Sequence, residues 1–69
     1  MHIKFAENLK NLRLEKSLLQ KELANILGVT QQCISGWELE KAEPTLTYLW
    51  KLADAFDISI DTLCGRREW

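Results

Sequence analysis

Proline, glycine, cysteine and histidine are all scarce in this sequence of 69 residues, which holds one proline, three glycines, two cysteines and one histidine. Turn residues are too few, and polar–apolar alternation too rare, for a fold built from strands. The remaining fold class is an all-α bundle with short connections. At this length we expect one domain over 1–69, with its core at about 3–65 and a C-terminal tail at 66–69.

The scarcity of sulfur and imidazole ligands argues against a structural zinc site, which needs about four of them. Cys33 and Cys64 form no Cys-x-x-Cys pair, and His2 stands beside the N-terminus. We expect both cysteines to be reduced packing residues. No internal histidine can activate either thiol as a nucleophile, so we expect no catalytic residue, metal or cofactor.

No apolar stretch is longer than three residues, as at Tyr48–Trp50, whereas a membrane-spanning helix needs about 20. The N-terminal residues Met1–Phe5 lack the apolar core of a secretory signal. We therefore expect a cytoplasmic protein with no membrane partner. Its 46% apolar and 28% charged residues are typical of a folded globular domain.

The charges are divided unevenly along the chain. The net charge is −1, but residues 1–37 carry +2 and residues 38–64 carry −4. A polyanionic partner is therefore expected to prefer the N-terminal half.

Apolar residues recur at helical spacing in five segments. Thr30, Thr45 and Ser59 precede three of the segments and are typical N-cap residues, and Gly28 is a typical residue after a helix end. Four of the predicted helices cover about 3–16, 20–27, 31–38 and 60–64, and the fourth in chain order follows Thr45 with an inward stripe from Leu46 to Phe56.

The two short helices between Leu19 and Glu38, joined by a turn at Gly28, have the spacing of a helix-turn-helix. The outward edge of the second helix is small or amide-bearing and uncharged. A carboxamide offers a donor and an acceptor together, which matches adenine in the major groove, and helix N-termini can seat phosphates. The alternative is an ordinary solvated face whose threonine and glutamines only cap the helix. The outward residues are Thr30, Gln31, Gln32, Ser35 and Gly36.

The stretch Leu18–Glu38 resembles the XRE, or Cro/repressor-type, helix-turn-helix family. The shared pattern is Leu-Ala in the first helix, Gly-Val at the turn, and Ile-Ser and Trp-Glu in the second helix. Pro44–Phe56 and Ile58–Leu63 look like the fourth and fifth helices of that family. The resemblance covers about residues 5–65. It implies a compact five-helix, repressor-like domain that regulates transcription by binding double-stranded operator DNA, usually as a two-fold dimer on a palindromic site.

The resemblance also implies site residues. Gln31 and Gln32 match base-reading positions, and Ser35 matches a position that touches a phosphate or the edge of the site. Phosphate contacts are expected from Gln20, Thr30 and Lys41. Arg13 and Glu38 match an ion pair that ties the first helix to the third, the alternative for Arg13 being a solvated surface cation.

Three apolar side chains have two interpretations each. Trp37 packs in the core, or its indole N–H contacts a phosphate. Trp50, one position off the inward stripe, is an interface aromatic or a half-buried flank. Ile60 is a candidate dimer contact, and otherwise an apolar residue of the last helix.

Four features depart from the family pattern. Leu19 replaces the usual threonine or serine cap, which costs stability unless Ser17 caps from an earlier start. Gly36 lies inside a helix, where it allows close approach to DNA or is only tolerated drift. Glu40 stands where a glycine often ends the helix, and the loop 39–43 is acidic. This acidic loop keeps a second function open: a protein-interaction module or an antitoxin, with weak DNA binding and an unknown protein partner.

Overall fold

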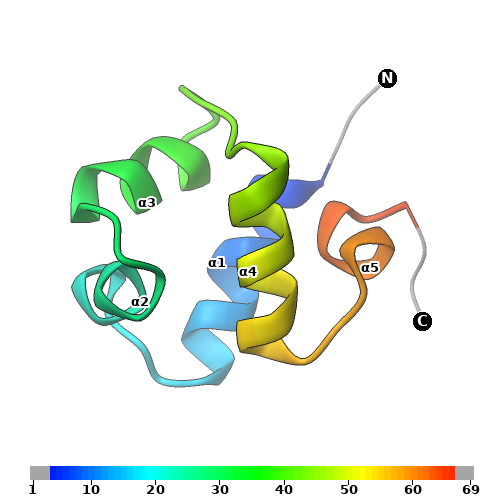
Figure 1. The fold of residues 1–69 in the computed structure, drawn as a ribbon, viewed down its shortest axis with the longest axis horizontal. Coiled ribbons are helices and arrows are strands. Elements are labelled where there is room, and N and C mark those ends of the chain that lie inside the picture. Colours follow the sequence, from blue (N-terminus) through cyan, green and yellow to red (C-terminus); the bar gives the residue numbers. More distant parts are fainter. Residues whose placement is uncertain (1–3, 67–69) are drawn as a thin grey trace.

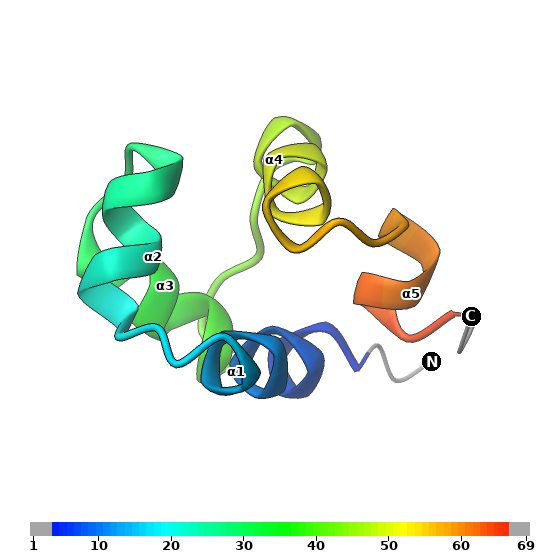
Figure 2. The same cartoon turned by 90° about the horizontal axis from the view of Figure 1, so that it is seen from below.

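The computed structural model describes residues 4–66, and these form five helices and no strand. The helices are α1 (Phe5–Glu15), α2 (Gln20–Leu27), α3 (Gln31–Glu38), α4 (Leu46–Phe56) and α5 (Ile60–Cys64). In Figure 1, α4 crosses in front of α1, with α2 and α3 on one side and α5 on the other. Figure 2 shows α1 and α4 facing each other. The prediction of an all-α, five-helix fold is confirmed.

The bounds of α2, α3 and α5 agree with the prediction from the sequence. The first helix is shorter than predicted, because it begins at Phe5 and ends at Glu15 rather than covering 3–16. Lys4 makes no side-chain capping hydrogen bond at its start. Shortly after its end, Ser17 has a left-handed φ of 56°, which turns the chain away from the helix axis.

The core draws one fully buried side chain from every helix. Around this core α3 packs against α1 and α2, α2 packs against α4, and α5 packs against α1 and α4. Burying each aliphatic side chain contributes about 1.5–3 kcal/mol. The five residues are Leu9, Leu23, Ile34, Leu52 and Leu63.

The N-terminal caps of α3, α4 and α5 are the predicted ones. Thr30 Oγ1 accepts the Cys33 N–H at 3.3 Å, Thr45 Oγ1 accepts that of Tyr48 at 3.4 Å, and Ser59 Oγ accepts that of Thr62 at 3.0 Å. At the end of α2, Gly28 has a φ of 75°, which a residue without a side chain adopts at little cost.

The start of α2 is stabilised differently from the other helix starts. Leu19 occupies the N-cap position but offers no side-chain acceptor. The Leu19 N–H instead donates to Glu22 Oε1 at 2.8 Å. Ser17 lies in the preceding turn and Leu19 is the N-cap, so the alternative that Ser17 caps from an earlier start is wrong. The bond between Leu19 and Glu22 is one of the two that make up a capping box. It stabilises the start of α2 in part, in place of the missing N-cap hydroxyl.

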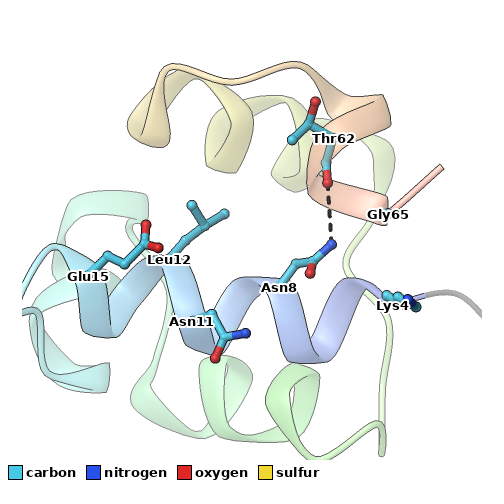
Figure 3. A pocket seen from close by; sticks show the side chains of 7 residues that line it. All are labelled: Lys4, Asn8, Asn11, Leu12, Glu15, Thr62 and Gly65. Atoms are coloured by element: carbon cyan, nitrogen blue, oxygen red, sulfur yellow. Dashed lines mark hydrogen bonds between the residues drawn. The ribbon is translucent and has the colours of Figure 1, made fainter. Parts of the chain in front are cut away.

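The side chain of Asn8 in α1 forms hydrogen bonds with the backbone of α5. Its Nδ2 donates to the carbonyl oxygens of Leu63 at 3.1 Å and Thr62 at 3.3 Å. Figure 3 shows this amide pointing from α1 toward α5, within a groove that Lys4, Glu15 and Gly65 also line. The contact gives the Leu63 carbonyl group near the end of α5 a partner and adds a second donor to the Thr62 carbonyl, which the Gly65 N–H also reaches at 3.1 Å.

Glu40 is a strained residue. Its φ is 61°, in the left-handed region that costs a residue with a side chain about 1 kcal/mol or more. We expect Glu40→Gly to raise the free energy of unfolding by up to about 1 kcal/mol, the gain being limited by the flexibility of glycine in the unfolded chain. Urea unfolding followed by circular dichroism measures it. Glu40→Gln, which removes the charge but keeps a side chain, should give no such gain. Equal gains in the two variants would contradict the assignment to strain.

Gly36 should be replaceable by a larger residue. A Cβ at this position would lie 3.9 Å from the Ala42 Cβ, an ordinary van der Waals distance. Since alanine is favoured over glycine inside a helix by about 1 kcal/mol, Gly36→Ala should stabilise the fold by about that amount. Gly28→Ala is the matched control, because a φ of 75° should make the same change destabilising. A loss of stability in Gly36→Ala in the same urea assay would contradict this account.

Candidate nucleic-acid interface

The pair α2 and α3 presents one helix face to the core and another outward. α3 packs against α2 and α1, burying Ile34 and Trp37. With about 100° between successive residues, Gln32, Ser35 and Gly36 lie on the side of α3 opposite these two. Each helix has only eight residues, too short to be stable alone, so the rest of the fold holds the outward face in place.

The proposed base-reading side chains are accessible in this arrangement. Gln31 and Gln32 are exposed in the first turn of α3, and Ser35 is half-buried one turn on. Thr30 is also exposed, with its hydroxyl engaged as the N-cap. The geometry leaves both carboxamides free to meet a partner from outside, and their contacts with bases stay a prediction.

Arg13 and Glu38 lie in a two-pronged ion pair. Arg13 Nε donates to Glu38 Oε2 at 2.7 Å, and Arg13 Nη2 donates to Glu38 Oε1 at 3.0 Å. Arg13 is only 8% exposed, so the alternative of a solvated cation is wrong. The hydrogen bond to Glu38 raises the pKa of Arg13, against the opposing effect of burial. Nη1 also donates to the Leu18 carbonyl oxygen at 2.8 Å, so one guanidinium joins α1, the following turn and the end of α3.

Gln20, the predicted phosphate contact on α2, also reaches this cluster. Its Nε2 donates to Glu38 Oε1 at 3.2 Å. Sequence reasoning missed this bond, because the two residues are 18 positions apart and nothing in their spacing brings them together. The predicted phosphate contact and the ion pair are therefore parts of one hydrogen-bonded cluster.

Lys41 lies in the loop after α3 and is exposed. Its backbone N–H donates to the Gly36 carbonyl oxygen at 2.9 Å, which folds the loop back onto the end of α3. Glu40 and Glu43 are exposed in the same loop. The cation predicted to contact phosphate therefore has two carboxylates as sequence neighbours, and these would repel the same phosphates.

The tryptophans occupy different environments. Trp37 is 6% exposed, and its ring centroid lies 5.9 Å from that of Tyr48, as the core-packing interpretation predicts. Trp50 is 63% exposed, so the half-buried alternative is wrong for it. Trp50 and the half-buried Ile60 line the same shallow pocket with Ile58. The two candidate dimer contacts therefore share one surface, which is mainly apolar and also includes Asp54.

Cys33 does not pack inside the fold, contrary to the prediction. It is exposed on α3, within 3.4 Å of the Thr30 hydroxyl, whereas Cys64 is half-buried. Among residues 4–66, no three histidine, cysteine, aspartate or glutamate side chains gather as ligands of a metal would. None of the helices in that range is long and apolar enough to cross a membrane.

Comparisons with known proteins identify this arrangement. A helix-turn-helix family model matches residues 9–63. The uncharacterized prophage-derived HTH-type transcriptional regulator YonR of Bacillus subtilis is 41% identical over 59 residues, which cover 86% of this chain and 55% of YonR. The chain spans about half the length of the curated relatives it matches.

Solved structures agree with the sequence comparison. The P22 c2 repressor, solved in complex with a synthetic operator, is similar with a TM-score of 0.85 and 28% identity, covering 91% of this chain and 96% of that one. A segment of the hydroxypropylphosphonic acid epoxidase from S. wedmorenis is similar too, with a TM-score of 0.77 and 38% identity over 87% of this chain and 32% of the epoxidase. The family resemblance seen in Leu18–Glu38 is thus confirmed, and the chain belongs to the XRE-type helix-turn-helix family.

Proposed function

We propose that this chain is a cytoplasmic, sequence-specific DNA-binding regulator of transcription, acting as a repressor through a single domain. In this proposal α3 enters the major groove of operator DNA. The observation that carries it is the exposure of two neighbouring carboxamides, Gln31 and Gln32, on a helix fixed by the Arg13–Glu38 ion pair. The similarity to the P22 c2 repressor, which was solved with an operator, supports the same assignment.

Each site residue has a role in the proposal. Gln31 and Gln32 read base edges, with Ser35 at the margin of the site. The phosphate contacts fix the register of the protein on the duplex but carry no sequence information. The proposed phosphate contacts come from Gln20, Thr30, Lys41 and the indole N–H of the buried Trp37.

The regulator binds as a homodimer on a palindromic site. Trp50 and Ile60 form the contact between the copies, because they supply a shared, mainly apolar surface that a second copy can cover. Two reading helices would then lie about 34–36 Å apart, one turn of the duplex. Sedimentation of the wild type and of Trp50→Ala, with and without DNA, tests this contact.

Selection from a random DNA library, repeated at two salt concentrations, tests the proposed function. We expect one two-fold-symmetric sequence to be enriched, with an affinity that falls steeply as salt rises because phosphate contacts release counterions. No enrichment of any sequence would overturn the proposal.

Cys33 is exposed on the flank of α3, so its chemical labelling reports whether DNA covers that flank. In the free protein, iodoacetamide should modify the exposed Cys33 faster than Cys64, since burial raises the pKa of the half-buried Cys64 thiol and keeps it protonated. Adding the selected DNA should slow the modification of Cys33 and leave the slow reaction of Cys64 unchanged. Unchanged labelling of Cys33 at saturating DNA would contradict a close approach of this flank of α3 to the duplex.

A protein-interaction module or antitoxin is the second candidate. The exposed Glu40 and Glu43 favour it, because they stand beside the predicted phosphate contact. The similarity to a segment of an epoxidase shows that this fold also occurs within an enzyme chain. Weak binding to every DNA sequence, with little salt dependence, would favour this candidate over the first.

A further inference from the structure

One oxygen atom connects three helices next to the proposed DNA-binding face. Glu38 Oε1 accepts hydrogen bonds from Arg13 Nη2 at 3.0 Å and from Gln20 Nε2 at 3.2 Å. The side chains of Arg13 and Glu38 are 9% and 4% exposed. Glu38 is the last residue of α3 and Gln20 is the first residue of α2, so the carboxylate ties the start of one helix to the end of the other.

The Gln20 side-chain amide can donate one more hydrogen bond than its contact with Glu38 uses. An amide nitrogen carries two hydrogens at fixed angles in one plane, and the bond to Glu38 uses one of them. Within residues 4–66, the second N–H of Gln20 has no hydrogen-bond partner. Gln20 is half-buried and stands where the α2 helix dipole favours an anion. The bond to Glu38 therefore fixes the plane of the amide and the direction of its second N–H.

We propose that Glu38 is a positioning residue, which holds the Gln20 amide so that its second N–H meets a DNA phosphate oxygen. This inference rests on the proposed function and adds a role that the sequence did not indicate. Glu38 is the last residue of α3, so its bond to Gln20 sets the proposed phosphate contact of α2 from the end of the reading helix. Gln20 then binds phosphate without first giving up side-chain freedom.

The charge balance of the cluster makes this arrangement compatible with DNA. A lone carboxylate beside a phosphate would repel it. Here Arg13 pairs with both oxygens of Glu38, and hydrogen bonding to Glu38 raises the pKa of Arg13, so the compensating charge persists. Glu38 can therefore orient Gln20 while presenting little net charge to the duplex.

Nuclear magnetic resonance tests the geometry directly. The two side-chain amide protons of Gln20 give separate signals, which Gln20→Met identifies by their disappearance. With DNA selected from the random library, we expect the proton bonded to Glu38 to keep its shift and protection. The other proton should move downfield and become protected from exchange. Loss of the first signal's protection, or no change in the second, would overturn the proposal.

A double-mutant cycle tests the positioning role. Gln20→Met should weaken binding to selected and random DNA alike by roughly tenfold. Glu38→Asp keeps a carboxylate for Arg13 but withdraws it from Gln20, and should weaken binding roughly three- to tenfold in the wild-type background. In the Gln20→Met background the same change should have no effect. Equal losses in both backgrounds would mean that Glu38 is only structural, and would overturn the inference.

The two proposals fail in different ways. If the wild-type chain selects no DNA sequence, the proposed function and this inference fall together. If the wild type selects a site but the Gln20 signals and the cycle show no coupling, this inference alone is wrong. Binding is compared at a temperature where circular dichroism shows each variant fully folded, and if Glu38→Asp does not fold, the resonance experiment decides.

Discussion

Replacing Arg13 with methionine should lower the free energy of unfolding by about 3 kcal/mol, since it leaves the Glu38 carboxylate buried without its partner. A domain of this length has about 3–5 kcal/mol of net stability, so the variant should keep about 0–2 kcal/mol and be marginally stable at room temperature. Urea unfolding followed by circular dichroism measures the change. Lys16→Met is the matched control, because Lys16 is an exposed cation near the end of the same helix, and its loss should have little effect.

The double variant Arg13→Met/Glu38→Met distinguishes a buried charge left unpaired from a general packing defect. Removing both charges should recover part of the stability that the single change loses. A double variant less stable than either single one would contradict this explanation. Because hydrogen bonding to Glu38 raises the pKa of Arg13 in the folded state, the stability contributed by the ion pair persists as pH rises above neutrality and is lost only in strong alkali.

Gln32→Ala should weaken binding to the selected operator by about 1–3 kcal/mol while leaving the affinity for random DNA nearly unchanged. The reason is that Gln32 lies on the outermost side of α3 and is exposed, so it is placed to contact bases rather than the backbone. Gln31→Ala should behave in the same way. Fluorescence anisotropy with the operator and with a shuffled duplex measures both affinities.

Lys41→Ala is the control for base reading. Lys41 is a single exposed cation in the loop after α3, and its removal should weaken binding to operator and random DNA by the same factor. Equal losses on both duplexes for the two glutamine variants would contradict their base-reading role.

The bounds of three helices could be predicted because each has a strong local signal. Thr30 and Ser59 mark where α3 and α5 begin, and Gly28 marks where α2 ends. These signals depend on neighbouring residues alone, so no knowledge of the tertiary fold was needed. The start of α1 carries no such signal, and its predicted start of residue 3 lies outside the described residues.

The contacts between helices were less accessible to prediction. The Arg13–Glu38 pair joins residues 25 apart and was suggested by the family resemblance, not by spacing. The Gln20–Glu38 bond has no sequence signal, because it depends on the angle at which α2 meets α3. The exposure of Cys33 was also missed, since the inward stripe of an eight-residue helix is too narrow for periodicity to place its flanks.

The eight-residue length of α2 and α3 determines how a destabilising substitution reduces the amount of protein that can bind. Neither helix persists outside the folded chain, so the unfolded chain offers no partial version of the outward face. The concentration of binding-competent molecules in a cell is then the total amount multiplied by the folded fraction. A core substitution far from α3 that unfolds half the molecules would halve the concentration of binding-competent protein, just as halving its expression would.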